Sequence, residues 1–226
     1  MSRITLIVVG CVSALLFLIG ISIDVVWLVA VTKPLPVLVM LVSVVRDHRA
    51  LPARFVALGL ALCALGDIVI GEPLALFVPG LICFLLGHLA YIVAFTAETR
   101  RAMALRAVPS LIYGVAAFAT LEPGLGDMAF PVVLYIVVIC GMLWRAWAWA
   151  AVYPSFASRL ALLGAALFVA SDTVLAFDRF RAPLPASSYI IIVLYWAGQL
   201  GITLSMLQRL RPSSSSSVAS TPASKR

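Results

Sequence analysis

The chain has 226 residues, of which 64% are hydrophobic and only 11% are charged, and its formal net charge is +7. So few polar residues cannot coat a water-soluble globule, which excludes a soluble protein and predicts an integral membrane protein. The basic balance does not indicate nucleic acid, because no basic stripe with interleaved aromatic residues is present. Contact of the loops with anionic lipid headgroups explains the charge.

Apolar segments recur along the whole chain. A hydrocarbon core of about 30 Å needs about 20 apolar residues per helix, so the sequence predicts an all-α bundle of about eight transmembrane helices. The first segment has no small-x-small cleavage site and is expected to be a retained helix. The second is the shortest. In chain order the expected spans are 4–27, 34–45, 55–70, 74–96, 104–120, 128–148, 158–177 and 188–207.

Residues 1–211 are therefore expected to form a single transmembrane domain. Residues 212–226 are rich in Ser and Pro and bury too little apolar area to order themselves, so they are predicted to be a disordered cytoplasmic tail. The four cysteines lie inside apolar spans at unrelated spacings. They predict neither a disulfide nor a metal cluster.

The distribution of Lys and Arg predicts the orientation. With eight spans both termini lie on one side of the membrane. Only Lys33, Arg179 and Arg181 of the 16 basic residues fall on the opposite side. The positive-inside rule therefore predicts that both termini are cytoplasmic.

Two aspartates interrupt apolar spans: Asp67 in ALCALGDIVIG and Asp172 in GAALFVASDTVLAF. A carboxylate in hydrocarbon costs roughly 2.5 to 3.5 kcal/mol even on lenient insertion scales, so each marks a candidate site. With the predicted orientation both lie about one turn from the extracytoplasmic ends of their helices. Two carboxyl groups that meet there are suited to acid/base chemistry.

Other polar residues are expected to join them. Asp24 and Lys33 fall at the same level, His88 and Tyr91 share a helix face, and Tyr195 and Gln199 are four residues apart. Most of them also have an ordinary explanation. Asp24 could cap its helix, Lys33 could extend to the headgroups, and His88, Tyr195 and Gln199 could be hydrogen-bonding partners between helices.

The two halves of the chain look faintly alike. An Ala-Leu pair precedes both aspartates at the same spacing, and Gly87-His88-Leu89 resembles Gly198-Gln199-Leu200. A parallel four-plus-four duplication would place both aspartates at equal depth. The offset that relates Asp67 to Asp172 differs from the offset that relates His88 to Gln199, so the duplication requires an insertion and stays open.

Taken in order, several motifs together resemble the YhhN-like lysoplasmalogenase family, over about residues 24–205. These are Lys33-Pro34-Leu35-Pro36, Gly66-Asp67, the run Gly80, Phe84, His88 and Tyr91, the segment from Gly164 through Ser171-Asp172 to Ala176, and Tyr195 with Gln199.

The resemblance implies an eight-helix hydrolase in the bacterial cell membrane. Its substrate would be a membrane lysophospholipid whose vinyl ether is cleaved to a fatty aldehyde and glycerophosphoethanolamine or glycerophosphocholine. The family's paired aspartates correspond to Asp67 and Asp172. A proton donor and a carboxylate suffice for this reaction, so no metal or other cofactor is expected. Ser171, Lys33, His88, Tyr91, Tyr195, Gln199 and Asp24 would support the pair or bind the lipid.

Other activities fit less well. The chain has only two histidines, His48 and His88, which excludes a three-histidine zinc site. No Gly-x-Ser-x-Gly elbow is present, which argues against a serine hydrolase. Gly124-Leu125-Gly126-Asp127 has the GxGD pattern of an intramembrane aspartyl protease, but it lies in an expected loop and is interpreted as a turn. A transporter that uses the same buried charges is the alternative function, and a purely structural membrane protein is a third. The sequence leaves the oligomeric state open.

Overall fold

The computed structural model describes residues 3–47 and 50–209. Within these residues the fold is all-α without strands, and eight segments are long and apolar enough to cross a membrane, which confirms the predicted class. The expected disordered tail over residues 212–226 and the loop position of His48 lie outside the described residues.

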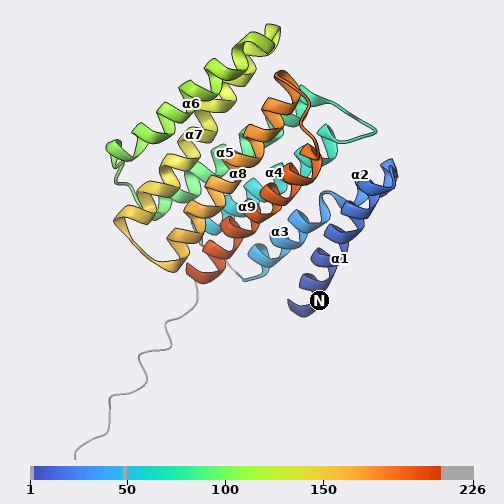
Figure 1. The fold of residues 1–226 in the computed structure, drawn as a ribbon. Coiled ribbons are helices and arrows are strands. Elements are labelled where there is room, and N and C mark those ends of the chain that lie inside the picture. Colours follow the sequence, from blue (N-terminus) through green and yellow to red (C-terminus); the bar gives the residue numbers. More distant parts are fainter. Residues whose placement is uncertain (1–2, 48–49, 210–226) are drawn as a thin grey trace, which may run out of the picture.

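Within residues 3–47 and 50–209, nine α-helices form the eight candidate spans, and Figure 1 shows their arrangement. They are α1 (Arg3–Ser22), α2 (Val26–Thr32), α3 (Leu35–Asp47), α4 (Leu51–Ile70), α5 (Phe77–Glu98), α6 (Ala107–Leu121), α7 (Ala129–Val152), α8 (Phe156–Phe180) and α9 (Ser187–Arg209). The Gly124–Asp127 motif falls on two short 3₁₀ turns between α6 and α7.

The first two spans differ from the prediction. The expected helix over 4–27 ends at Ser22, because Asp24 adopts a left-handed conformation with φ of 54°. Helix α2 then begins at Val26 and, with α3, makes one candidate span from Val26 to Arg46. Hydropathy alone missed the turn because the apolar residues continue on both sides of Asp24.

Arg145 lies inside α7, within the expected span 128–148, and is 6% exposed. Its guanidinium donates to Thr96 Oγ1 at 3.0 Å, to Arg101 O at 3.2 Å and to Thr99 O. Arg145 therefore ties α7 to the end of α5, and its buried charge is hydrogen bonded as such a group requires.

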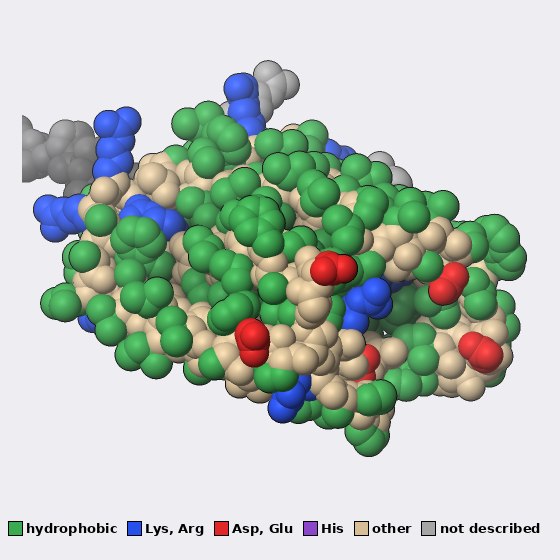
Figure 2. Space-filling model, turned by 90° about the horizontal axis from the view of Figure 1, so that it is seen from above, with side chains coloured by type: hydrophobic (Ala, Val, Ile, Leu, Met, Phe, Trp, Pro, Cys, Tyr) green, Lys and Arg blue, Asp and Glu red, His purple; other side chains and the backbone are tan. Residues whose placement is uncertain are grey.

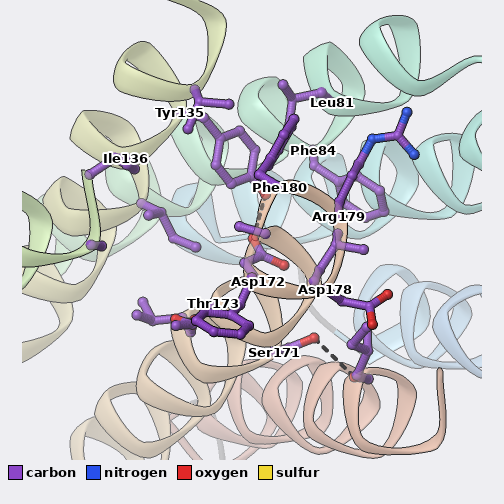
Figure 3. Close-up of a pocket in the computed structure, with 18 of the residues that line it drawn as sticks. Leu81, Phe84, Tyr135, Ile136, Ser171, Asp172, Thr173, Asp178, Arg179 and Phe180 are labelled. Atoms are coloured by element: carbon purple, nitrogen blue, oxygen red, sulfur yellow. Dashed lines mark hydrogen bonds between the residues drawn. The ribbon is translucent and has the colours of Figure 1, made fainter. Parts of the chain in front are cut away.

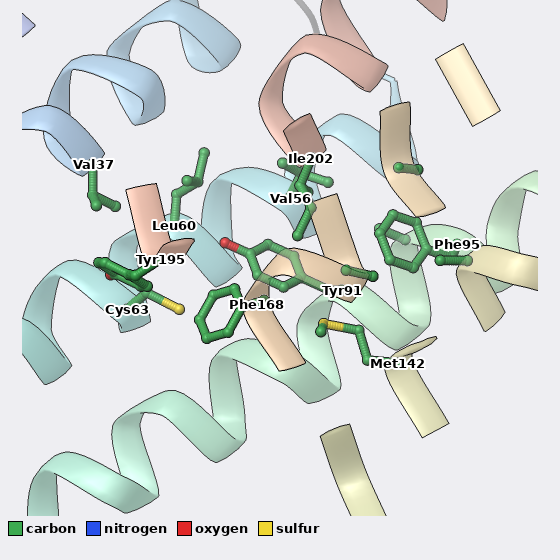
Figure 4. Packing of buried hydrophobic residues seen from close by; sticks show 14 of the residues in the cluster. Val37, Val56, Leu60, Cys63, Tyr91, Phe95, Met142, Phe168, Tyr195 and Ile202 are labelled. Atoms are coloured by element: carbon green, nitrogen blue, oxygen red, sulfur yellow. The ribbon is translucent and has the colours of Figure 1, made fainter. Parts of the chain in front are cut away.

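Two helical hairpins, α4–α5 and α8–α9, make the most extensive helix contacts of the fold. In Figure 1 they occupy the middle of the bundle, with α6 and α7 on one side and α1 to α3 on the other. Buried side chains from these hairpins and from α3 and α7 form the main core, including Leu60, Tyr91, Phe168 and Ile202 (Figure 4).

The packing repeats between the halves of the chain. Helix α1 packs on α3 as α6 packs on α7, and α3 packs on α4 as α7 packs on α8. Across the halves, α5 packs on α7 and α9 packs on α3. The same order of contacts in both halves supports the four-plus-four duplication that the sequence left open.

Glycines at equivalent positions bring each hairpin together. Gly164 follows Gly59 by the same offset that separates Asp172 from Asp67, and Gly198 follows Gly87 as Gln199 follows His88. A Cβ on Gly87 would lie 3.2 Å from Gly59 O, and a Cβ on Gly198 would lie 2.9 Å from Gly164 O. Close backbone approach through small residues is how membrane helices pack without a hydrophobic driving force.

The outer surface is largely hydrophobic in the view of Figure 2, as expected for helices that face lipid. Basic side chains gather at the left end of this view. Acidic side chains lie toward the other end, where the surface is hollowed beside a basic side chain.

Gly198→Ala should destabilise the protein by about 1–3 kcal/mol, because the added methyl would overlap the α8 backbone at Gly164 and Phe168. The matched change Gly141→Ala places its Cβ 3.4 Å from Ile92, an ordinary contact, and should change stability by less than about 0.5 kcal/mol. Thermal unfolding followed by Trp fluorescence in detergent measures both. Equal midpoints for the two variants would contradict the close packing of α8 and α9.

Candidate active site

A cavity of about 520 Å³ lies among α4 to α9, and both Asp67 and Asp172 line it. Figure 3 shows the part of the lining around Asp172. Most of the other lining side chains are apolar. The volume is in the range typical of ligand pockets, roughly 300 to 1,000 Å³. A second cavity of about 570 Å³ lies among α1, α3 and α9, but none of the described residues that line it is acidic. The first cavity is therefore the candidate site.

Asp67 lies one turn before the end of α4 and is 3% exposed. The preceding Gly66 lets α4 approach the ring of Phe84, since a Cβ there would lie 2.9 Å from Phe84 Cε2. This close contact packs α4 against α5, and the Asp67 carboxyl group lines the cavity beside it.

Asp67 has two partners from distant parts of the chain. Lys33 Nζ lies 3.6 Å from Oδ1, and the Tyr195 hydroxyl donates to Oδ2 at 2.8 Å. Lys33 sits at the junction of α2 and α3, and Tyr195 is on α9, so three separate segments meet at one carboxylate. The ion pair satisfies a charge that would otherwise be costly inside an apolar bundle. Both predicted supporting residues, Lys33 and Tyr195, thus reach the site.

Asp172 lies on α8 and has a different partner. The Tyr135 hydroxyl of α7 donates to Asp172 Oδ2 at 2.5 Å. Because α8 continues to Phe180, Asp172 lies about two turns from the helix end, not the one turn expected. It still lines the same cavity as Asp67. The neighbouring Ser171 lines the cavity as well, but its hydroxyl donates to Ile191 O at 2.9 Å and ties α8 to α9.

His88, Tyr91 and Gln199 do not line this cavity. His88 is fully buried, and its ring packs edge-on against Phe168 at 4.6 Å and Tyr135 at 5.4 Å between centroids. Neither ring nitrogen has a hydrogen-bond partner among the described residues. Tyr91 donates to Gln199 Oε1 at 2.6 Å, joining α5 to α9. These three residues lie within the packed bundle and do not touch the cavity.

Asp24 is separated from the site. It is exposed, occupies the turn between α1 and α2, and is not among the residues that line the cavity. The structure therefore brings Lys33, Asp67, Ser171, Asp172 and Tyr195 together but not Asp24. Within the described residues, no group of three or more His, Cys, Asp or Glu side chains is arranged to hold a metal ion.

Two lining residues were missed at the sequence level. Tyr135 is the donor to Asp172, and the only available signal was a hydroxyl-bearing ring inside an otherwise apolar span, which usually finds a hydrogen-bond partner. Arg179 lines the cavity on α8, with its guanidinium carbon 3.8 Å from the centroid of the Phe77 ring. It had been counted only as a loop charge.

Comparison with known proteins identifies the family of this chain. The YhhN family model matches residues 28–206. This chain belongs to the YhhN family. It is 34% identical over 192 residues to human lysoplasmalogenase TMEM86B, covering 80% of this chain and 76% of that protein. It is 30% identical over 199 residues to lysoplasmalogenase TMEM86A of Bos taurus, covering 82% and 81%. No solved structure matches it.

In this YhhN protein, Lys33→Met should destabilise the fold, because it leaves the Asp67 carboxylate buried without its cation. Breaking a fully buried pair costs about 3–5 kcal/mol, and the cost here should be smaller because the Lys33 side chain is 22% exposed. Adding Asp67→Asn to Lys33→Met removes the orphaned charge and should recover most of the loss. Unfolding midpoints of Lys33→Met and of the double variant test this. A double variant that unfolds at no higher temperature than Lys33→Met would contradict the pairing.

Proposed function

We propose that this protein is a membrane lysoplasmalogenase that uses Asp67 and Asp172 for acid/base catalysis. It would hydrolyse the vinyl ether of a lysophospholipid to a fatty aldehyde and glycerophosphoethanolamine or glycerophosphocholine. The observation that carries the proposal is that both carboxyl groups line one mostly apolar cavity. The names of the similar proteins, lysoplasmalogenases of human and cattle, support the same activity.

The chemistry matches the groups in the cavity. Vinyl-ether hydrolysis begins when a proton is delivered to the alkene carbon distal to the ether oxygen, which produces an oxocarbenium ion. Water then adds to give a hemiacetal that separates into aldehyde and alcohol. One carboxylic acid and one carboxylate are sufficient for these steps, and general acid/base groups contribute about 10²- to 10⁴-fold each. The proposed mechanism is therefore metal-independent.

The lining also suits the two parts of such a lipid. Apolar side chains of α6 and α7, including Ala117 and Ile136, line the space where an alkenyl chain would lie. Lys33 and Arg179 provide the positive charge that a phosphate group requires. Phe77 holds the Arg179 guanidinium by a cation–π contact.

We also propose that the protein lies in a bacterial cell membrane with both termini cytoplasmic. Lys33, Arg179 and Arg181 are the only basic residues assigned to the opposite side, and two of them line the cavity. The few positive charges on that side therefore belong mainly to the site. The cavity would then open toward the extracytoplasmic leaflet.

Aldehyde release from a vinyl-ether lysophospholipid tests the activity. The purified wild-type protein should release aldehyde in detergent with a chelator present, and Asp67→Asn and Asp172→Asn should each lower kcat by about 10²- to 10⁴-fold. Asp24→Asn is the matched control, because Asp24 is exposed and outside the cavity. It should retain wild-type activity.

A folded wild-type protein that releases no aldehyde would overturn the proposal. Gradient-driven uptake of a solute into sealed vesicles, abolished by the same two substitutions, would instead establish the transporter alternative.

Cysteine labelling in intact bacterial cells tests the orientation. An impermeant maleimide should label Asp127→Cys, between α6 and α7, and should label Ala102→Cys, after α5, only once the cells are lysed. Both positions are exposed in the fold. The reverse pattern would place the termini outside.

A further inference from the structure

The two aspartates occupy equivalent positions in the two halves of the fold but have different partners. We infer that Asp172 is the proton donor of the reaction, positioned by Tyr135, and that Asp67 is a permanently charged carboxylate that stabilises the cationic intermediate. This inference rests on the proposed lysoplasmalogenase function and assigns separate roles within its site.

Asp67 is held in its charged form by its surroundings. An ammonium group lies 3.6 Å from one carboxyl oxygen, and a phenol donates to the other at 2.8 Å. The Asp67 side chain is 1% exposed and the Lys33 side chain is 22% exposed, so water weakens the attraction between them only in part. A proton on Asp67 would leave Lys33 without its counter-charge and would compete with the Tyr195 donor.

No cation among the described residues forms an ion pair with Asp172. Among the described residues its polar contact is Tyr135, a neutral phenol that donates to Oδ2. Oδ1 accepts no hydrogen bond from the described residues, and Asp172 lines the cavity. An unpaired carboxyl group in apolar surroundings is favoured in its neutral form. A proton on Oδ1 is therefore placed where it can reach a bound alkene.

Sequence divergence between the two halves of the chain explains why Asp67 and Asp172 have different partners. Lys33 and Tyr135 each lie on the segment directly before the helix of the aspartate they contact, α4 and α8 respectively. One half thus supplies a cation where the other supplies a phenol. Tyr195, the second donor to Asp67, is matched by Phe84, at the same offset that relates Gln199 to His88. Phe84 has no hydroxyl to donate, so the half that contains it offers no equivalent second donor.

The proposed step conserves atoms and charge. The π electrons of the alkene form a C–H bond with the Asp172 proton, and the Asp172 O–H bond breaks to leave a carboxylate. The adjacent carbon and the ether oxygen share the positive charge, which faces the Asp67 carboxylate. Water adds to that carbon and returns a proton to Asp172. The hemiacetal then separates into aldehyde and alcohol, and both aspartates regain their starting states.

Infrared spectra of the protein in lipid nanodiscs at neutral pH test the assignment directly. The C=O stretch of a protonated carboxyl group is separate from the stretches of carboxylates. The wild-type band of protonated carboxyl should be lost in Asp172→Asn and retained in Asp67→Asn and in the control Asp24→Asn. Should Asp172→Asn fail to fold, Asp172→Glu should shift the band without removing it.

Loss of the protonated band in Asp67→Asn, or its absence from the wild type, would overturn the inference. This readout needs no substrate, so its failure is distinct from a failure of the proposed function, which aldehyde release decides.

Chemical rescue tests the same roles during turnover. Formate added to Asp172→Ala should restore aldehyde release in proportion to formic acid, rising about tenfold for each unit fall in pH, above the pKa of formic acid. Formate added to Asp67→Ala should restore it in proportion to the anion. Rescue of Asp67→Ala by the acid form would reverse the two roles.

Discussion

The constraint that shapes this protein is that each acidic side chain inside the apolar bundle needs an ion-pair or hydrogen-bond partner from another segment of the chain. Asp67 on α4 takes Lys33 from the α2–α3 junction and Tyr195 from α9, and Asp172 on α8 takes Tyr135 from α7. Because bilayer lipid offers no hydrogen bonds, these contacts must form within the protein. Asp67 therefore joins α4 to the remote helix α9 and to the α2–α3 junction, and Asp172 joins α8 to the preceding α7. Both carboxyl groups line the same cavity.

A second constraint brings the helices close enough for such contacts. Gly59 with Gly87, and Gly164 with Gly198, let the α4–α5 and α8–α9 backbones approach closely, and each pair lies on the hairpin that carries one of the aspartates. Without a hydrophobic force between helices in lipid, this packing supplies much of the cohesion. Equivalent glycines and equivalent helix contacts indicate that the two hairpins arose by duplication of one helical unit. The duplication explains why two acids line a single cavity.

Much of this arrangement was predictable from the sequence. Apolar length predicted the spans because the bilayer imposes that length, and isolated aspartates stood out because their burial is costly. Tyr135 and Arg179 were missed since neither departs from what a span or a loop commonly contains, and only the packing of α7 on α8 places Tyr135 beside Asp172. Asp24 differs from the expectation in the opposite direction. The sequence groups it with the site, but the left-handed turn there leaves it exposed and outside the cavity lining.

His88 does not reach the cavity, but it belongs to a set of packed aromatic rings that connects the partners of the two acids. His88 packs against Tyr135, the donor to Asp172, and against Phe168, whose ring lies 5.2 Å from Tyr195, the donor to Asp67. Edge-to-face rings at such distances attract one another and restrict rotation. The two tyrosine hydroxyls are consequently oriented through one continuous set of contacts. A polar residue on the helix face toward the site can thus act indirectly, through the ring it packs against. Helical spacing in the sequence does not distinguish this indirect role from direct contact with a substrate.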